Sequence, residues 1–313
     1  MRRLESMRIA YGEALAEYGA VNLDVVVLDA DVSASSQTHY FAKRFPERFF
    51  NLGVAEAGMI DVAVGLALAG KIPFANTFAF LIALRAAEQV RTCVAYARTN
   101  VKLAATYAGL SDSKDGPTHH SICDLSVMRA MPNIVVLVAA DAVEARKMVP
   151  LVAEWDGPVY LRISRAEVPV VFDEDHQVEI GKGVVLRDGS DVSLVGTGVM
   201  VSRCLDAAEK LEESGVNARV AEISTLKPLD HELLLAAAKE TGGLVTAEEH
   251  SIIGGLGEAV ASYVSETYPV PLRRVGIRDT FTETGPYFEL LDRYGMAVGD
   301  ITSAAREVVR RRP

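Results

Sequence analysis

Short runs of β-branched and aromatic residues alternate along this chain with longer stretches of helical pattern. The first half holds six such runs, at residues 24–30, 48–54, 71–77, 101–107, 133–139 and 158–164. Helical patterns fill most of the intervals, and Asp141 stands where an N-cap is expected for the helix after the fifth run. Apolar strands separated by helices are typical of a parallel sheet covered on both faces. The sequence therefore predicts a doubly wound α/β fold.

Acidic residues and two glycines interrupt this rhythm at residues 168–183, where we expect a linker. Strand and helix patterns alternate again beyond it and predict a second, smaller α/β domain. At 313 residues the chain is long enough for two domains of ordinary size. We therefore expect one domain over residues 1–175 and another over residues 185–313.

Composition and charge exclude several classes of function. The net charge of −10 argues against nucleic acid or an anionic membrane surface as the main partner. The first 19 residues read as an amphipathic helix and not as a signal peptide, and the longest apolar run, at 62–70, is far shorter than the ~20 residues that span a bilayer. Three widely spaced cysteines indicate reduced thiols in a cytoplasmic protein.

Glu56 is the most unusual candidate residue. It lies in residues 51–70, a stretch of small and aliphatic residues that contains no Lys or Arg. In doubly wound folds, ligands bind beyond the carboxyl ends of the strands, and Glu56 comes just after a predicted strand. One interpretation is a carboxylate at a helix N-terminus, which contributes roughly 0.3–1 kcal/mol. The other is an acid/base carboxylate kept dry by neighbours such as Val54, Ala55, Met59 and Ile60.

Other loops after strands carry further candidates. The loop at 111–124 holds Asp115, Thr118 and two adjacent histidines, of which His119 suits proton transfer or substrate binding. A zinc site made of His119, His120, Cys123 and Asp124 is a weaker alternative, because adjacent histidines diverge. The loop at 29–37 reads as a Ser-rich turn, and Arg165 follows a strand where it could bind phosphate. GTGVM (196–200) and GGLG (254–257) are interpreted as tight turns and not as phosphate loops.

Several of these segments together resemble one enzyme family. GVAEAGM, the NTF at 76–78, RAAEQVR, DGPTHH, RAMPNIVVL, LRISR, LKPLD and TAEEHSIIGGLGEA occur in the order found in the C-terminal half of transketolases. The resemblance runs from about residue 6 to the last helix. The chain thus looks like the free-standing C-terminal subunit of a split transketolase, with a pyrimidine-binding domain followed by a transketolase C-terminal domain.

The resemblance implies roles for individual residues. In this family a glutamate, here Glu56, hydrogen-bonds the aminopyrimidine of thiamine diphosphate and so helps to form the ylid. Asp31 matches an aspartate near the cofactor, and Phe78 and Phe80 lie where aromatic rings stack on the pyrimidine, although Leu81 could take that place instead. The remaining matches concern the substrate: the sugar phosphate would be held by Arg8, Ser35 and Arg165, and the ketose hydroxyls and proton transfer would involve Asp115 and His119.

The resemblance also implies a partner. The family binds Mg²⁺ and the diphosphate through a GDG…N motif, and GDG does not occur in this sequence. We therefore expect no metal ligands from this chain, and a second, N-terminal subunit that supplies them. An α₂β₂ assembly with self-association of this chain and the cofactor at the subunit interface is the expected arrangement.

Departures from the family pattern leave the substrate open. Tyr107 replaces a histidine, Lys114 replaces a glutamate, and His120 follows His119. Transfer of a two-carbon ketol unit between sugar phosphates is the leading hypothesis, with a specialised ketose phosphate as an alternative donor. Related alternatives are a deoxyxylulose phosphate synthase-like enzyme, the β subunit of a 2-oxo-acid dehydrogenase, and a non-catalytic regulatory subunit of the same fold.

Overall fold

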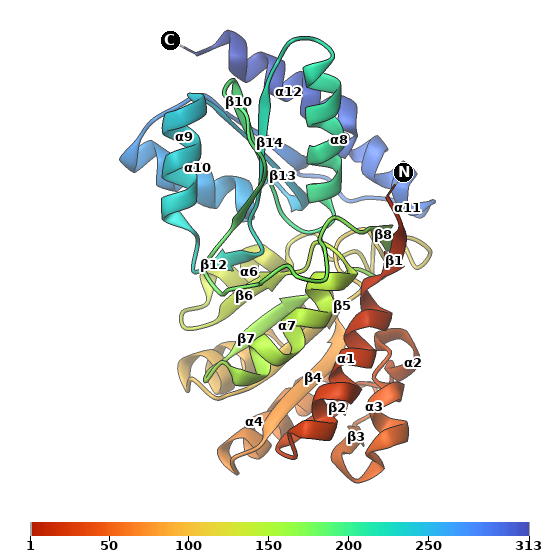
Figure 1. Cartoon of the computed structure of the whole chain (residues 1–313). Coiled ribbons are helices and arrows are strands. Elements are labelled where there is room, and N and C mark those ends of the chain that lie inside the picture. The colour runs from red at the N-terminus through yellow and green to blue at the C-terminus, as the bar shows by residue number, and fades with distance from the viewer. Residues whose placement is uncertain (1, 313) are drawn as a thin grey trace.

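The computed structural model describes residues 2–312 and contains two sheets, one in each half of the chain (Figure 1). The sheet of the first half has seven strands in the order β12-β6-β7-β5-β4-β2-β3. All of its strands are parallel except β12, which pairs antiparallel with β6. The six strands predicted for the first half are all present: β2 (Val25–Asp29), β3 (Phe49–Asn51), β4 (Ile72–Phe78), β5 (Lys102–Thr106), β6 (Val135–Val138) and β7 (Val159–Arg162).

Helices cover both faces of this sheet because successive strand residues point to opposite sides. Val25 and Val27 of β2 belong to one core with helices α1 and α7, whereas Val26 and Leu28 belong to a second core with α4 and α6. The helices and helical turns of this half are α1 (Met7–Val21), α2 (Ser33–Ser36), α3 (His39–Arg44), η1 (Pro46–Arg48), α4 (Glu56–Leu68), α6 (Asp124–Ala130) and α7 (Ala142–Glu154). Asp141 caps α7 as predicted, by accepting a bond from the backbone N–H of Glu144.

The helix expected near residues 85–98 has a different form. Two π-helical segments, η2 (Leu81–Arg85) and η3 (Val90–Tyr96), flank the single turn α5 (Ala87–Gln89). The wider turns of a π-helix shift the direction of the side chains that follow, and such segments often occur at functional sites.

The second half is a smaller doubly wound domain. Its five-stranded sheet has the order β14-β13-β10-β11-β9, parallel except for β9, and lies above the first sheet in Figure 1. The strands are β9 (Val184–Arg187), β10 (Val192–Gly196), β11 (Ala218–Glu222), β13 (Leu244–Ser251) and β14 (Leu272–Ile277). Its helices are α8 (Met200–Glu212), α9 (His231–Thr241), α10 (Leu256–Thr267), α11 (Tyr287–Leu291), η4 (Asp292–Met296) and α12 (Val298–Arg310). Tight turns follow β10 and β13, as expected, with Gly198 and Gly254 at positive φ.

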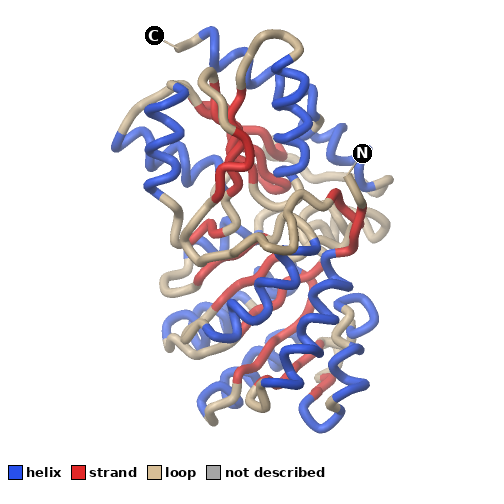
Figure 2. The backbone as a smooth tube through the Cα atoms, in the orientation of Figure 1, coloured by secondary structure: helices blue, strands red, loops and turns tan. Residues whose placement is uncertain are grey.

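Three short strands depart from the sequence-based expectation. The N-terminal segment is not helical throughout, because β1 (Leu4–Ser6) precedes α1 and pairs with β8 (Glu167–Pro169), which lies at the start of the expected linker. Strand β12 (Thr225–Lys227) comes from the second half of the chain but joins the sheet of the first. Many loops from both halves meet between the two sheets (Figure 2). Within residues 2–312, the helices are all too short or too polar to cross a bilayer.

Candidate active site

The predicted site residues come from loops at one edge of the seven-stranded sheet. Strands β7, β5, β4, β2 and β3 are neighbours in the sheet and run parallel, so their carboxyl ends lie side by side. Arg165 follows β7, Tyr107 follows β5 and Phe80 follows β4. The loop at 30–37 follows β2, and Glu56 follows β3. The strand order therefore brings together residues that are far apart in the sequence.

Tyr107 is at the centre of this cluster. It is buried, and its backbone has a positive φ of +57° directly after β5. Phe78 stacks on the ring with 4.3 Å between centroids, and Arg8 donates a 3.3 Å hydrogen bond to the phenolic oxygen. The Arg165 guanidinium lies 4.8 Å from the ring centroid on a cation–π contact. Two arginines predicted to bind phosphate thus converge on the residue that departs from the family pattern.

Ser35 contacts Arg8 through its backbone carbonyl and not through its hydroxyl. Arg8 donates to the Ser35 carbonyl oxygen at 3.0 Å, which leaves the Ser35 hydroxyl available to a ligand. The Arg8 Nε atom is buried and has no hydrogen-bond partner within residues 2–312. A guanidinium with an unused donor in a cluster of two arginines is suited to an anion.

Asp112, which the sequence did not single out, restrains Arg165. Its carboxylate is 0% exposed and accepts a 2.9 Å bond from Arg165 Nη1. Burial and the neighbouring Asp115 raise the pKa of Asp112 to about 7, in spite of the guanidinium. Near neutral pH this carboxyl therefore changes charge directly beside the arginine, which makes it a candidate control on anion binding.

His119 and the two candidate aromatic residues lie together. The Phe80 ring is 5.2 Å from the His119 ring, edge to face, and the Phe78 ring is 6.4 Å away. Thr118 contacts His119 Nδ1 at 3.0 Å, and Asp115 is exposed in the same loop. The histidine, the arginine cluster and the aromatic rings therefore form one continuous group.

Glu56 is the first residue of α4, and its side chain is only 2% exposed. Arg85 Nη1 reaches both carboxylate oxygens, at 2.9 and 3.1 Å, from a side chain that is 54% exposed. Arg85 is the last residue of η2, and η2 begins directly after Phe80. One short segment therefore carries Arg85 beside Glu56 and Phe80 beside His119. Met59 and Ile60 are buried near Glu56, whereas Val54 and Ala55 are exposed in the single chain.

Asp31 lies on the outer side of the same edge. It follows β2 with a φ of +65°, is exposed, and accepts a 2.9 Å bond from the Asn51 side chain at the end of β3. Asn51 is a second residue that the sequence did not indicate. The two side chains form a polar rim beside the loop that leads into Glu56.

The loop that carries His119 is fastened to the second half of the chain. His120 Nδ1 and the Thr282 hydroxyl are 2.5 Å apart, and the Gly285 N–H donates to the Ser113 carbonyl at 3.2 Å. Burial lowers the pKa of His120, so it accepts or donates through this contact as a neutral ring. The C-terminal domain therefore positions the loop on which His119 lies.

A buried ion pair reinforces this attachment. Arg162 Nε donates to Asp124 at 2.7 Å, and Tyr160 donates to the same carboxylate oxygen at 2.7 Å. Arg162 also donates to the backbone carbonyls of Ser121 and Glu249, both at 3.1 Å. The zinc interpretation finds no support in this arrangement, because Asp124 and His120 are bonded to different partners and no group of His, Cys, Asp and Glu within residues 2–312 could hold a metal ion.

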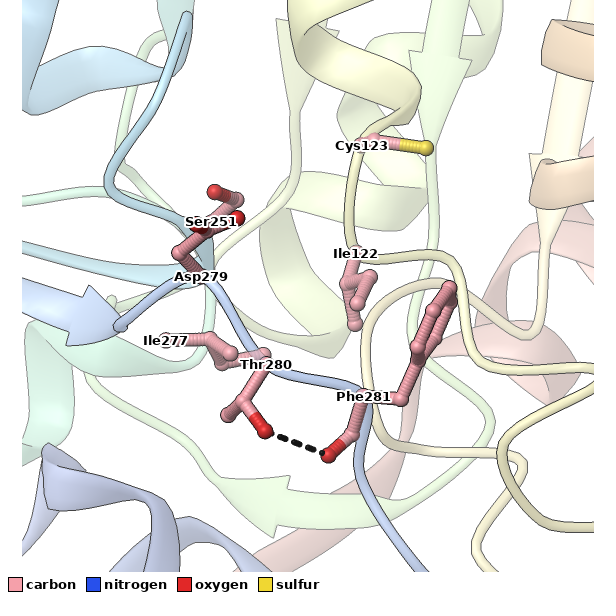
Figure 3. Close-up of a pocket in the computed structure, with 7 residues that line it drawn as sticks. All are labelled: Ile122, Cys123, Ser251, Ile277, Asp279, Thr280 and Phe281. Carbon is pink, nitrogen blue, oxygen red and sulfur yellow. Dashed lines mark hydrogen bonds between the residues drawn. The ribbon is translucent and has the colours of Figure 1, made fainter.

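A cavity of about 250 Å³ lies where this loop meets the second domain (Figure 3). Ile122 and Cys123 form one wall, and Ser251, Ile277 and residues 279–281 form the other. Of the candidate residues named from the sequence, only Cys123, from the zinc alternative, lines it. The cavity is therefore a feature of the domain junction and not part of the arginine–histidine cluster.

Comparisons with known proteins identify the family. The family model for the transketolase pyrimidine-binding domain matches residues 5–171, and that for the transketolase C-terminal domain matches residues 181–301. A Methanocaldococcus jannaschii protein named for the C-terminal section of transketolase is 43% identical over 98% of this chain and 97% of its own length. The 6-deoxy-6-sulfo-D-fructose transketolase subunit SqwH of a Clostridium species is 42% identical over 98% of this chain and 95% of its own length.

A solved structure extends the match to three dimensions. A split-gene transketolase, described as an inactive beta4 tetramer, is 48% identical and superposes with a TM-score of 0.93, covering 98% of this chain and 99% of that one. The order of the motifs, the two sheets and these relatives all lead to the same assignment. The chain belongs to the transketolase family, as a subunit that corresponds to the C-terminal section of the enzyme.

Proposed function

We propose that this chain is one subunit of a transketolase that transfers a two-carbon ketol unit from a ketose phosphate to an aldose phosphate. The observation that carries the proposal is that Arg8 and Arg165 both contact Tyr107, and that Tyr107 stacks on Phe78, whose ring lies 6.4 Å from that of His119. Buried Glu56 belongs to the same sheet edge. Two guanidinium groups suit a sugar phosphate, and a histidine beside them suits proton transfer to and from sugar hydroxyls.

The residues at this edge fit thiamine diphosphate. Glu56 is buried, and the only bonds to its carboxylate within residues 2–312 come from the half-exposed Arg85, which can turn away to solvent. Glu56 would bond a ring nitrogen of the aminopyrimidine, Phe78 or Phe80 would pack against the ring, and Asp31 would lie nearby. When bound, the cofactor supplies the carbon nucleophile and electron sink that two-carbon transfer requires.

The chain's own residues would then orient the substrate. Arg8, Arg165 and the free Ser35 hydroxyl would hold the phosphate, and Asp115 and His119 would contact the ketose hydroxyls. His119 would accept and return the hydroxyl proton as the carbon–carbon bond breaks and forms. The donor could also carry another anionic group, because relatives include subunits named for 6-deoxy-6-sulfo-D-fructose and for apulose-4-phosphate.

A partner subunit is part of the proposal. Large apolar side chains on and around the helix of Glu56 and the π-helical segments are exposed in the single chain; they are Val54, Val62, Leu68, Leu84 and Tyr96. An exposed apolar surface beside a site is typical of a protein interface. We expect an N-terminal transketolase subunit to cover it and to supply the Mg²⁺ and diphosphate ligands, in a cytoplasmic α₂β₂ assembly. We place the domain boundary between residues 175 and 185.

The test is reconstitution. The chain is mixed with an N-terminal transketolase subunit, thiamine diphosphate and Mg²⁺, and loss of xylulose 5-phosphate is followed with ribose 5-phosphate as acceptor. The sulfofructose and apulose phosphate donors are assayed in parallel. Glu56→Gln should assemble normally and lose activity by several orders of magnitude. Removal of a single acid–base group typically costs ~10²–10⁴-fold in rate. The exposed Glu47→Gln serves as the matched control.

Two outcomes would reject the proposal. Consumption of pyruvate in place of a ketose would indicate a synthase or an oxo-acid dehydrogenase. Near wild-type activity of the assembled Glu56→Gln variant would show that this carboxylate does not serve the cofactor.

A further inference from the structure

A second cavity, of about 190 Å³, lies at the junction of the two domains and away from the candidate active site. Its walls come from α7, from the linker segment 176–184 and from the end of β11. Two buried glutamates, Glu144 and Glu222, line it together with His176. The proposed function uses none of these residues.

Glu222 is the residue that needs an explanation. It is the last residue of β11 and only 1% exposed, and its Oε1 atom is buried without a hydrogen-bond partner within residues 2–312. Burial and the nearby Glu144 and Asp141 carboxylates raise the pKa of Glu222 well above the ordinary range of a glutamate. A buried carboxyl group without a donor is costly, and such groups are rare unless they have a role.

The neighbouring carboxylates already accept bonds within the chain, although each carboxylate oxygen can accept one more. Glu144 Oε2 accepts a 2.8 Å bond from the Ala140 N–H, and Glu144 Oε1 is 3.3 Å from His176 Nε2. Asp141 Oδ2 accepts backbone N–H bonds from residues 171 and 172 at 2.7 and 2.9 Å. Glu222 is therefore the carboxyl in this group that still needs a donor.

The lysine at the rim does not supply that donor. Lys182 also lines the cavity, but its ammonium group bonds the exposed Glu232 at 3.0 Å, on the outside. The interior of the cavity thus has acidic groups and no free cation from the described chain. An external cation with N–H donors would satisfy Glu222 and reduce the repulsion between the carboxylates.

The chemistry favours an organic cation over a metal ion. The described residues hold no group of three metal-ligating side chains in suitable geometry, here or elsewhere. An ammonium group needs only acceptor oxygens, which both glutamates provide. We propose that this cavity binds a small organic cation with an ammonium group, held by Glu222 and Glu144 between the two domains. The proposal does not depend on the proposed function.

Calorimetry on the full chain tests this site with 1,4-diaminobutane as the probe. The wild-type chain should bind it, and binding should release a proton from Glu222, which is detected by repeating the titration in buffers of different ionisation enthalpy. Glu222→Gln should weaken binding by about tenfold or more, because a charge-assisted bond is lost. Tetramethylammonium has the charge but no N–H donors and should not bind.

Glu213→Gln, an exposed glutamate at the end of α8, is the matched control and should bind like the wild type. Because Gln is neutral and has the shape of a protonated glutamate, the Glu222 variant should fold, and thermal unfolding checks this. No binding by the wild-type chain at millimolar probe, or equal binding by the Glu222→Gln variant, would overturn the proposal.

Discussion

The pair formed by Asp112 and Arg165 gives a quantitative prediction about anion binding. Asp112 is fully buried, accepts a 2.9 Å bond from Arg165, and has its pKa raised to about 7 by burial and by Asp115. An anion bound to Arg165 is repelled by the charged Asp112 carboxylate. Anion binding therefore requires that Asp112 be protonated, and this protonation costs free energy above pH 7. We therefore expect Asp112→Asn, which imitates the protonated carboxyl, to strengthen anion binding at alkaline pH.

The size of the effect follows from the pKa. The cost of protonating a group of pKa about 7 is a factor of roughly 11 in affinity at pH 8, or about 1.4 kcal/mol, and only about 1.1 at pH 6. The anion affinity of the wild-type chain should therefore be greatest below pH 7 and should fall as the pH rises through 7. Asp112→Asn should therefore bind about tenfold more tightly than the wild type at pH 8 and equally at pH 6.

Sulfate is the suitable probe, because it remains a dianion over this pH range whereas phosphate changes its own charge. Sulfate is titrated into ¹⁵N-labelled chain at pH 6, 7 and 8, and the backbone amide signals of Arg165 and Ser35 are followed by NMR. Asp188→Asn, whose side chain is 92% exposed in the other domain, is the matched control and should leave the affinity unchanged.

Two results would refute this reasoning. One is a sulfate affinity of the wild-type chain that does not change between pH 6 and pH 8. The other is an Asp112→Asn variant that binds sulfate no better than the wild type at pH 8.

Three further predictions concern other contacts of the site and its support. Arg85→Ala should cost about 1–3 kcal/mol in urea unfolding, because it leaves the buried Glu56 carboxylate without its donor, and should tighten thiamine diphosphate binding in the assembled enzyme by freeing Glu56; weaker cofactor binding would contradict it. Thr282→Val should lower kcat with little change in KM, because it releases His120 and the loop of the site, and Thr282→Ser should restore kcat; a change confined to stability would argue against this positioning role. Arg162→Met should destabilise the chain by about 3–5 kcal/mol in urea unfolding, since it leaves a buried carboxylate unpaired, and a loss below 1 kcal/mol would be inconsistent with that burial.

The strands that the sequence predicted correctly are those with a long apolar pattern. Five of the six strands of the first half, all except the edge strand β3, are near-continuous apolar runs buried on both faces, which is the clearest signal a parallel sheet provides. Strands β1, β3, β8 and β12 have only three residues each, which is too few for a periodicity to be visible, and of these only β3 was predicted, within the longer run 48–54. Their pairing depends on tertiary contacts that no local pattern reports.

The site shows the same division between local and distant information. Burial of Glu56 could be predicted because its neighbours in sequence are apolar, but its partner Arg85 lies 29 residues away and on a π-helical segment. Asp112 reads as an ordinary loop residue, and only the fold reveals that it is buried against Arg165. Residue types and their order were sufficient to locate the loops of the site, whereas the charge partners required the three-dimensional arrangement.

Strand β12 has a consequence for how this protein can be divided. It crosses from the second half to complete the edge of the first sheet beside β6, so a fragment that stopped at the linker would expose the backbone of Val135–Val138, four apolar residues in a row. Such an edge is ready to pair with another copy and to aggregate. A soluble fragment of the first half would have to carry residues 225–227 with it, and any recombination that exchanged the C-terminal domain would have to preserve this strand. The first domain therefore depends on the second for a complete sheet, and the two have to be kept together.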